Sequence, residues 1–439
     1  MHSAVEGLAA ADPRRGAWRS RASVAVPCEA ARREARLGLY VHVPFCARRC
    51  TYCDFSTGTL SAAAVERYLA AIAREVELRA GALSGHCFTS VFLGGGTPSA
   101  LSARQFRRLW EPIRRHFAID PRAEITLEGN PESVRPAVLE AWAEASVNRL
   151  SVGAQSFDRD ELAALGRVHS AERPAEALAL ARSFGIHRLS VDLMFGFPGN
   201  RPEHWAASIE SALALEVEHL SAYCFIPEPG TEMGDAVASG RAVCPAPDLQ
   251  AQAYGDLDQR LGRAGYDCYE TSNFCRPGAE ARHNLVYWLR RPYLGLGPSA
   301  HGYIDGRRYG NHYGLGRWAR AVELGQLPEA ESEIETETSV AREIVMLGLR
   351  LSGGLRPADY AEPEWHAVVG RYQRAFERAL STGRLERSGA GVRIPARFRF
   401  VADEAIAWIE AEAERTAVDR AQPAFILSTV CPNPHSQVA

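Results

Sequence analysis

The sequence predicts an α/β fold built around a parallel β-sheet, and two features of the chain carry this prediction. From about residue 39 to residue 225, short apolar runs alternate with longer amphipathic runs. The short runs are rich in β-branched and aliphatic residues and end near Gly or Pro, which is typical of buried parallel strands. Such β-α units in series imply right-handed crossovers, and they leave open whether the sheet closes partly into a barrel or stays doubly wound.

The expected strands and helices alternate through this region. The six strands are LYVHV from Leu39, SVFLGG from Ser90, EITLEG from Glu124, RLSVGA from Arg149, HRLSVDLMFG from His187 and HLSAYCF from His219. The helices between them are the stretches 62–80, 103–116, 136–145, 171–184 and 203–215, and a further helix is expected within 245–263.

The pattern changes after the sixth strand, so we divide the chain into five segments. We expect residues 1–36 to be a disordered N-terminal extension and residues 37–230 to hold the parallel sheet. Residues 231–325 form a connecting region rich in Gly and aromatic residues. Residues 326–414 are mostly helical with a short β-like pair, which predicts a small α-rich, winged-helix-like domain, and residues 415–439 are expected to be a disordered tail.

Composition and charge exclude several classes of protein. The 439 residues are 46% hydrophobic and carry a net charge of −3, so no nucleic-acid partner is expected. The chain has no lysine, which excludes a P-loop and a pyridoxal Schiff base. No apolar run reaches the roughly 18 residues that span a bilayer. Outside one trio the cysteines are scattered, and the N-terminus lacks a secretory h-region, which predicts a cytoplasmic protein.

The trio of cysteines lies in PFCARRCTYCDF, just past the end of the first strand, where sites form in parallel α/β folds. A disulfide would use two of Cys46, Cys50 and Cys53 and strand the third. Zinc needs a fourth ligand, and the candidate His42 belongs to the strand. An iron–sulfur cube held by three cysteines leaves one iron open for a small molecule.

C-x₃-C-x₂-C after a first strand resembles the radical S-adenosylmethionine (SAM) superfamily, which implies a 4Fe-4S cluster with SAM on the open iron. Polar residues at further strand ends favour one shared site, although each alone is typical of a cap or a turn. Arg167 suits the SAM carboxylate, with a solvated helix arginine as the alternative. The residues assigned to SAM are Tyr40, Tyr52, Gly95, Gly96, Thr97, Glu128, Gln155, Arg167 and Asp192.

Longer phrases give a closer resemblance from about Leu39 to Tyr303. FLGGGTPS, SVGAQSF, LMFGFPGN, AYCFIPEPGT and YLGLGPSAHGY are similar to the oxygen-independent coproporphyrinogen III oxidases and their relatives. The oxidases carry a fourth cysteine where this chain has Phe55. The branch of heme chaperones, HemW, has an H-N-x-x-Y-W motif, which is present here as His283, Asn284, Tyr287 and Trp288. This resemblance implies heme binding and a partial (β/α)₆ barrel.

The residues around this motif are compatible with heme. A neutral imidazole of His283 can ligate iron, and the aromatic side chains offer flat faces to a porphyrin. Arg290 and Arg291 suit propionates. His301 is a rival ligand or a residue of the SAM pocket. Without the resemblance, a hydrogen-bonded histidine and core aromatics are the simpler interpretation.

The leading hypothesis is a heme chaperone that carries a 4Fe-4S cluster and SAM and transfers heme to an acceptor protein. The alternative is an oxygen-independent coproporphyrinogen III oxidase, which decarboxylates its substrate through a 5′-deoxyadenosyl radical. The third hypothesis is a cluster-bearing protein that acts on an unrelated substrate. The last is a zinc-binding scaffold. No catalytic residue is assigned. The heme acceptor considered is a respiratory or membrane-bound protein, and the oligomeric state considered is a homodimer.

Overall fold

The structure is a computed structural model that describes residues 36–421. Most of the expected N-terminal extension therefore lies outside the described residues, as does the tail beyond residue 421. The last helix, α13 (Ala402–Ala421), continues into the segment expected to be a tail.

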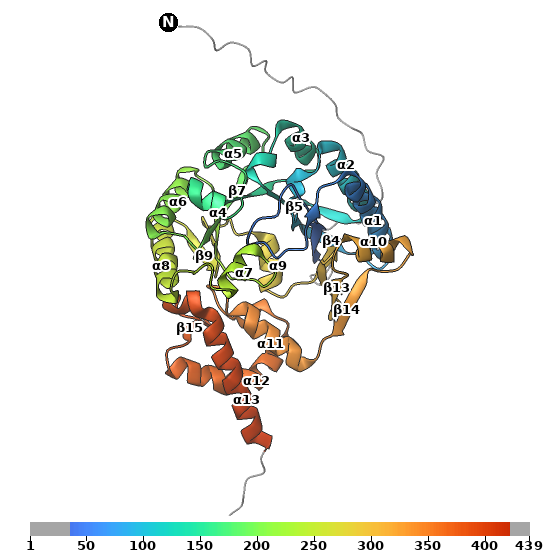
Figure 1. The fold of residues 1–439 in the computed structure, drawn as a ribbon. Coiled ribbons are helices and arrows are strands. Elements are labelled where there is room, and N and C mark those ends of the chain that lie inside the picture. The colour runs from blue at the N-terminus through green and yellow to red at the C-terminus, as the bar shows by residue number, and fades with distance from the viewer. Residues whose placement is uncertain (1–35, 422–439) are drawn as a thin grey trace, which may run out of the picture.

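A single sheet of twelve strands dominates the fold, in the order β14-β13-β12-β11-β1-β4-β5-β6-β7-β8-β10-β9. The six predicted strands are all present and pair in parallel, with β11 also parallel to β1. The order is linear, so the curved sheet is an open, partial barrel (Figure 1). The predicted strands are β1 (Arg36–Val43), β4 (Cys87–Gly95), β5 (Ala118–Gly129), β6 (Arg149–Gln155), β7 (Arg188–Phe195) and β8 (His219–Cys224).

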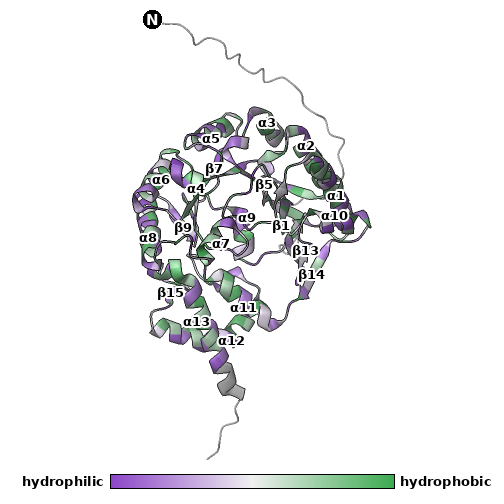
Figure 2. Cartoon of the chain, in the orientation of Figure 1, coloured by the Kyte–Doolittle hydropathy of each residue, from purple (hydrophilic) through white to green (hydrophobic). Residues whose placement is uncertain are grey.

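Helices cover the outer face of the sheet, where Figure 2 shows apolar and polar residues mixed along each helix. The predicted helices are confirmed as α1 (Ala62–Ala80), α2 (Ala103–His116), α3 (Pro136–Glu144), α5 (Arg173–Ser183), α6 (Pro202–Ala214) and α8 (Pro247–Arg263). Four short helices that the sequence did not predict are α4 (Arg159–Ala164), α7 (Glu232–Ala238), α9 (Arg282–Trp288) and α10 (Leu315–Glu323).

Alternation along β1 separates the core from the inner face of the barrel. Leu39, Val41 and Val43 are fully buried in the main core, which packs the sheet against the outer helices. Each large apolar side chain buried in this way contributes about 1.5–3 kcal/mol. Tyr40 and His42 lie on the opposite, inner face, because successive strand residues point to opposite sides.

The connecting region extends the same sheet at both ends. After β8, the chain forms β9 (Asp267–Glu270) and β10 (Asn273–Cys275) beside it. Helix α9 (Arg282–Trp288) then leads across to the far side, where β11 pairs with β1. The remaining elements are β11 (Tyr293–Leu296), β12 (His301–Ile304), β13 (Arg307–Asn311), α10 (Leu315–Glu323) and β14 (Glu329–Ile334), and a small pair is formed by β2 (Phe45–Cys46) and β3 (Gly58–Thr59).

The C-terminal residues form an α-rich unit with its own apolar core. It consists of α11 (Glu337–Gly348), α12 (Glu362–Ser381), the hairpin β15 (Glu386–Ser388) and β16 (Gly391–Arg393), and α13. Ion pairs join it to the barrel, among them Arg399 with Asp258 at 2.9 Å. Across residues 36–421, no helix has the length and apolar character needed to cross a membrane.

Candidate functional site

The three cysteines follow β1: Cys46 ends the short strand β2, and Cys50 and Cys53 lie in the loop after it. Contacts to distant elements hold this loop in place. The Thr51 amide donates to the Leu165 carbonyl at 3.3 Å, and the Thr51 carbonyl accepts from the Met233 amide at 2.8 Å. The Arg49 guanidinium donates twice to the Cys53 carbonyl, at 3.1 and 3.0 Å. The cysteines therefore sit on a fixed frame at the end of the barrel where the parallel strands end.

The surroundings of the thiols suit a metal cluster. The Thr97 hydroxyl lies 3.4 Å from the Cys46 sulfur, and an Arg167 nitrogen lies 3.5 Å from the Cys50 sulfur. Burial raises the pKa of the Cys46 thiol and raises the pKa of the Cys53 thiol to about 11. Both stay protonated at neutral pH unless a metal stabilises the thiolates. Three thiolates on one loop are the donor set of a 4Fe-4S cluster with one open iron.

The zinc alternative has no support in the described part of the chain. No group of three or more His, Cys, Asp or Glu side chains among those residues, the three cysteines included, is already gathered around one point as ligands of a metal ion. The candidate fourth ligand, His42, is 5% exposed and uses both ring nitrogens. Its Nδ1 lies 3.0 Å from the Tyr40 hydroxyl, and its Nε2 lies 2.9 Å from the Ser56 carbonyl oxygen.

A cavity of about 410 Å³ opens beside the cysteine loop and brings together nearly all residues that the sequence assigned to SAM. The three cysteines line it together with Tyr52, Gly95, Gly96, Thr97, Glu128, Gln155, Arg167 and Asp192. Tyr40 is the exception: it does not line this cavity, and its ring lies 6.2 Å from that of Phe92 on the inner face of the sheet. We call this space the cysteine cavity.

The glycine turn after β4 serves close packing against the cysteine loop. A Cβ at Gly96 would lie 2.7 Å from the Phe45 carbonyl oxygen, and a Cβ at Gly95 (φ 103°) would lie 2.4 Å from the His42 ring. The Gly96 amide donates a hydrogen bond to the Val43 carbonyl at 2.9 Å, and the Gly95 amide donates one to the Glu128 carboxyl group at 3.1 Å. Both amides are therefore already hydrogen-bonded within the protein.

The charged groups that line the cysteine cavity include the carboxyl groups of Glu128 and Asp192 and the guanidinium of Arg167. Burial, with the nearby Asp192 carboxylate, raises the pKa of Glu128 to about 7. Burial also raises the pKa of Asp192, which accepts a hydrogen bond from Ser151 at 2.9 Å. Arg167 is fixed by bonds to Asn130 (2.8 Å) and to a backbone carbonyl (2.6 Å), so it is not a solvated helix arginine. Groups of both signs in one cavity suit a zwitterionic ligand.

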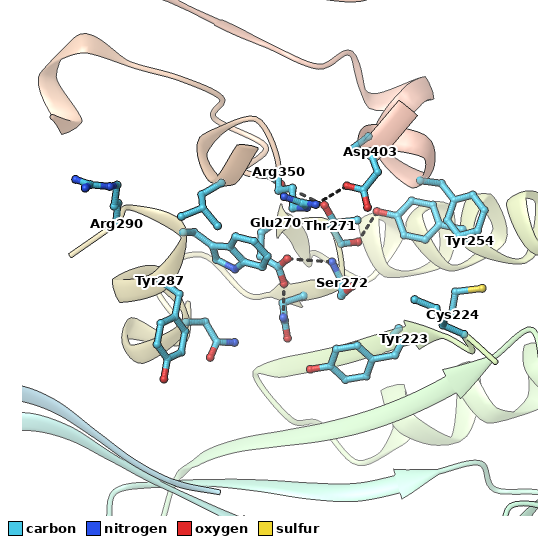
Figure 3. A pocket seen from close by; sticks show the side chains of 18 of the residues that line it. Tyr223, Cys224, Tyr254, Glu270, Thr271, Ser272, Tyr287, Arg290, Arg350 and Asp403 are labelled. Atoms are coloured by element: carbon cyan, nitrogen blue, oxygen red, sulfur yellow. Dashed lines mark hydrogen bonds and ion pairs between the residues drawn. The ribbon is translucent and has the colours of Figure 1, made fainter. Parts of the chain in front are cut away.

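A larger cavity of about 880 Å³ lies where the barrel meets the C-terminal unit (Figure 3). Asn284, Tyr287 and Trp288 of the H-N-x-x-Y-W motif line it from α9. Its opposite wall comes from β10 and from the end of β8, and its rim includes Arg350 and Asp403, which form an ion pair of 2.7 Å. We call it the interdomain cavity.

The fourth residue of the motif, His283, lies outside both cavities. It is 1% exposed, and its ring stacks on Phe92 of β4 with centroids 5.2 Å apart. Its Nδ1 lies 2.9 Å from the Ser90 hydroxyl, and its Nε2 lies 2.9 Å from the Tyr287 hydroxyl. Burial lowers the pKa of His283 to about 3, so it is a neutral anchor of α9 inside the barrel.

The other residues considered for heme lie in different surroundings. His301 is exposed on β12 and lines neither cavity. Arg291 lines the interdomain cavity and donates to the Asp359 carbonyl at 2.6 Å. Arg290 also lines it, but its guanidinium already contacts three carboxylates, those of Glu335, Glu343 and Glu364. It is thus a structural link to the C-terminal unit rather than an open partner for propionates.

Several lining residues were missed by the sequence analysis. Residues 223–226 line both cavities, and Tyr254 and Glu270 line the interdomain cavity. Tyr223 lies near the end of β8, so the argument applied to the ends of β5, β6 and β7 could have found it. Tyr254 and Glu270 depend on how α8 and β9 fold against β8, and no local motif marks that arrangement.

Comparison with known proteins identifies the fold and the family. The family model described as "Radical SAM superfamily" matches residues 40–212, which cover β1 to α6. The solved structure of coproporphyrinogen III oxidase (HemN) from Escherichia coli aligns with a TM-score of 0.75 over 88% of this chain and 92% of that one. At 22% identity, this likeness supports the fold. Fold, cysteine loop and family model together define a radical SAM protein.

Sequence relatives give the narrower group. The chain is 37% identical over 372 residues to a Mycobacterium tuberculosis (strain CDC 1551 / Oshkosh) protein named heme chaperone HemW, covering 84% of this chain and 93% of that protein. It is 33% identical over 357 residues to the Bacillus subtilis (strain 168) protein of the same name, covering 80% and 93%. The chain belongs to the HemW family of radical SAM proteins.

Proposed function

We propose that this protein binds heme in the interdomain cavity and passes it to an acceptor protein. The observation that carries the proposal is that Asn284, Tyr287 and Trp288 face one 880 Å³ cavity, which adjoins the cysteine cavity. This volume lies within the range of about 300–1,000 Å³ typical of small-molecule sites. The names of the relatives, heme chaperones, support the same ligand.

The lining of the interdomain cavity suits an aromatic ligand. The rings of Tyr223, Tyr287 and Trp288 offer flat apolar faces for a porphyrin. Four arginines and three carboxyl groups line the walls, and burial raises the pKa of the carboxyl group of Glu270. Arg290, Arg308 and Arg350 already pair with carboxylates, so most of the charge of these walls is compensated within the protein. The cationic residues are Arg290, Arg291, Arg308 and Arg350.

His283 belongs to the heme site as a positioning residue in this proposal. Both its ring nitrogens have hydrogen-bond partners, and Tyr287, which accepts or donates one of these bonds, lines the cavity itself. Direct ligation of heme iron by His283 would require that the Tyr287 hydroxyl release Nε2. The side chains at the cavity wall that carry an atom able to ligate iron include Tyr287, Tyr223 and Cys224.

We further propose that Cys46, Cys50 and Cys53 hold a 4Fe-4S cluster and that the cysteine cavity binds SAM. When bound, the cluster supplies an iron with an open position for SAM. Arg167 suits the carboxylate of SAM, and the acid pair Glu128 and Asp192 suits its amino or hydroxyl groups. Iron and sulfide analysis of anaerobically reconstituted protein tests the cluster, with each cysteine changed to Ala in turn.

The second candidate is a porphyrinogen-decarboxylating enzyme. It is favoured by the shared wall of the two cavities, which places a ligand of the interdomain cavity beside the SAM site. Against it, the cysteine cavity has the side chain of Phe55, 59% exposed, where the resembling oxidases carry a fourth cysteine. We expect no protoporphyrinogen when reconstituted protein is incubated with coproporphyrinogen III, SAM and a reductant.

The decisive experiment for the chaperone function is heme transfer. The reconstituted protein is loaded with heme, freed of excess ligand, and mixed with an apo-protein of the heme-binding class whose absorbance differs from that of the donor. The proposal predicts stable one-to-one loading followed by transfer. Loading without release to any acceptor, or no saturable loading, would contradict it.

A further inference from the structure

The cysteine cavity and the interdomain cavity have one stretch of chain in common, residues 223–226 at the end of β8. Backbone bonds fix this stretch on both sides. The Ala222 amide donates to the Ser272 carbonyl at 2.8 Å, and the Phe225 amide donates to the Phe195 carbonyl at 2.8 Å. Because the backbone is held between β7 and β10, the side chains of this stretch are the part of the shared wall that can respond to a ligand in either cavity.

Tyr223 is the side chain placed to contact both spaces. In the β7–β8 register it lies opposite Met194, and Ser221 lies opposite Asp192. Since alternate strand residues share a face, Tyr223 is on the same inner face as Asp192 and Met194, which line the cysteine cavity. Figure 3 shows its ring extending from β8 into the interdomain cavity, toward the side where Tyr287 lies.

Exposure and charge agree with this placement. Tyr223 is 43% exposed although it belongs to an interior strand, because its ring faces cavity space instead of the packed core. The accessible surface belongs to cavity space, and the protein still encloses the hydroxyl, which raises its pKa, as do the nearby carboxyl groups of Asp192 and Glu270. Asp192 belongs to the cysteine cavity and Glu270 to the interdomain cavity, so the hydroxyl lies within reach of both sites.

We propose that Tyr223 is a shared contact of both ligands, so that SAM in the cysteine cavity changes the affinity of the interdomain cavity for heme. This inference rests on the proposed function and names how its two sites are coupled. Linkage requires the effect to be reciprocal: heme must change the affinity for SAM by the same factor. Binding at one of two coupled sites typically changes the affinity of the other site by about 5- to 150-fold. We therefore expect SAM to change the affinity for heme by at least about fivefold.

The test is a pair of titrations on the full chain, reconstituted anaerobically. Heme affinity is measured from the Soret band with and without saturating SAM, and SAM affinity is measured by calorimetry with and without saturating heme. We expect equal factors in both directions for the wild type. Tyr223→Ala should bring both factors close to one, while Tyr223→Phe, which keeps the ring, shows whether the hydroxyl or the ring carries the coupling.

Tyr254→Phe is the matched control, because Tyr254 lines the interdomain cavity and does not line the cysteine cavity. It should leave the coupling factor at the wild-type value. Iron content and thermal unfolding show that each variant holds its cluster and folds. Heme binding that is the same with and without SAM overturns this inference and leaves the proposed function standing. Coupling that survives Tyr223→Ala overturns the role of Tyr223, and failure of the wild type to bind heme overturns the proposed function itself.

Discussion

The Nε2 atom of His283 lies 2.9 Å from the hydroxyl oxygen of Tyr287, one helical turn further along α9. This bond joins a residue anchored in the barrel to a residue that faces the interdomain cavity. The other ring nitrogen of His283, Nδ1, lies 2.9 Å from the hydroxyl oxygen of Ser90 in β4. The motif therefore combines one interior anchor with three residues that line a ligand space, and its histidine fixes the position of the others.

Replacing this anchor is expected to affect folding and heme binding together. His283→Ala leaves the Ser90 and Tyr287 hydroxyls without their partner and opens a cavity beside Phe92, which should cost about 2–4 kcal/mol of unfolding free energy. Urea denaturation measures the loss. Soret titration should show weaker heme binding because Tyr287 is no longer held.

The spectrum of bound heme separates positioning from ligation. His283→Gln restores a polar side chain at the anchor, and we expect its ferric heme to give the same electron paramagnetic resonance signal as the wild type. A change of axial ligand in this variant would show that His283 binds the iron directly, and would contradict the positioning role.

Arg290 should be more important for stability than a surface arginine. It is buried and contacts Glu335, Glu343 and Glu364, so Arg290→Gln leaves three carboxylates without their common partner. Removing one partner of a buried ion pair typically costs about 3–5 kcal/mol. The control is Arg107→Gln, an exposed pair with Glu144 whose loss should cost at most about 1 kcal/mol. Equal losses in chemical denaturation would refute this role.

Two glycines with the same backbone conformation test the packing of the cysteine loop. Gly166 has φ 72°, and a Cβ there would lie 3.2 Å from the Thr51 amide nitrogen. Gly185 has φ 81° and open space around its Cβ position. Alanine at either position should cost about 1–2 kcal/mol of backbone strain. Only Gly166→Ala should also lower the iron content after reconstitution, because it moves the loop; equal iron in both variants would argue against this.

The stability of the protein should fall in weak acid, in part because of His169. Burial first, then Arg167 and Arg173, lower its pKa to about 4, although Glu132 lies 3.7 Å away. The unfolded chain takes up a proton near pH 6.5 and the folded chain resists it, so stability is lost as the pH falls from 6.5 toward 4. The loss is about 1–3 kcal/mol at this site. His169→Gln should flatten the profile of unfolding free energy against pH; an unchanged profile would show that His169 does not contribute.

The sequence predicted those elements whose signal lies within a few neighbouring residues. The apolar runs of the six parallel strands, the amphipathic helices and the cysteine spacing are each encoded within a few residues, and the strand-end residues Glu128, Gln155 and Asp192 do meet in one cavity. The short strands β9 to β14 were not predicted, because they are stabilised by pairing with the edges of a sheet formed elsewhere in the chain.

The burial of His283 and the interdomain cavity also escaped prediction. Both depend on where α9 crosses the barrel, which is decided by its contacts with β4 and with the C-terminal unit. The surroundings of Tyr40 were not predictable either. Tyr40 lies in β1, which leads to the cysteine loop, but its hydroxyl bonds to His42 and its side chain does not line the cysteine cavity.

The most direct test of the account is a heme titration of anaerobically reconstituted wild-type protein beside Trp288→Ala and Tyr313→Ala. Trp288 lines the interdomain cavity, whereas Tyr313 is 67% exposed and lines neither cavity. We predict saturable binding of one heme, a loss of about tenfold or more in affinity in Trp288→Ala, as expected for a lost aromatic contact of about 1.4 kcal/mol, and no change in Tyr313→Ala. Absence of saturable binding in the wild type, or equal affinity in Trp288→Ala, would contradict the claim that this cavity holds heme.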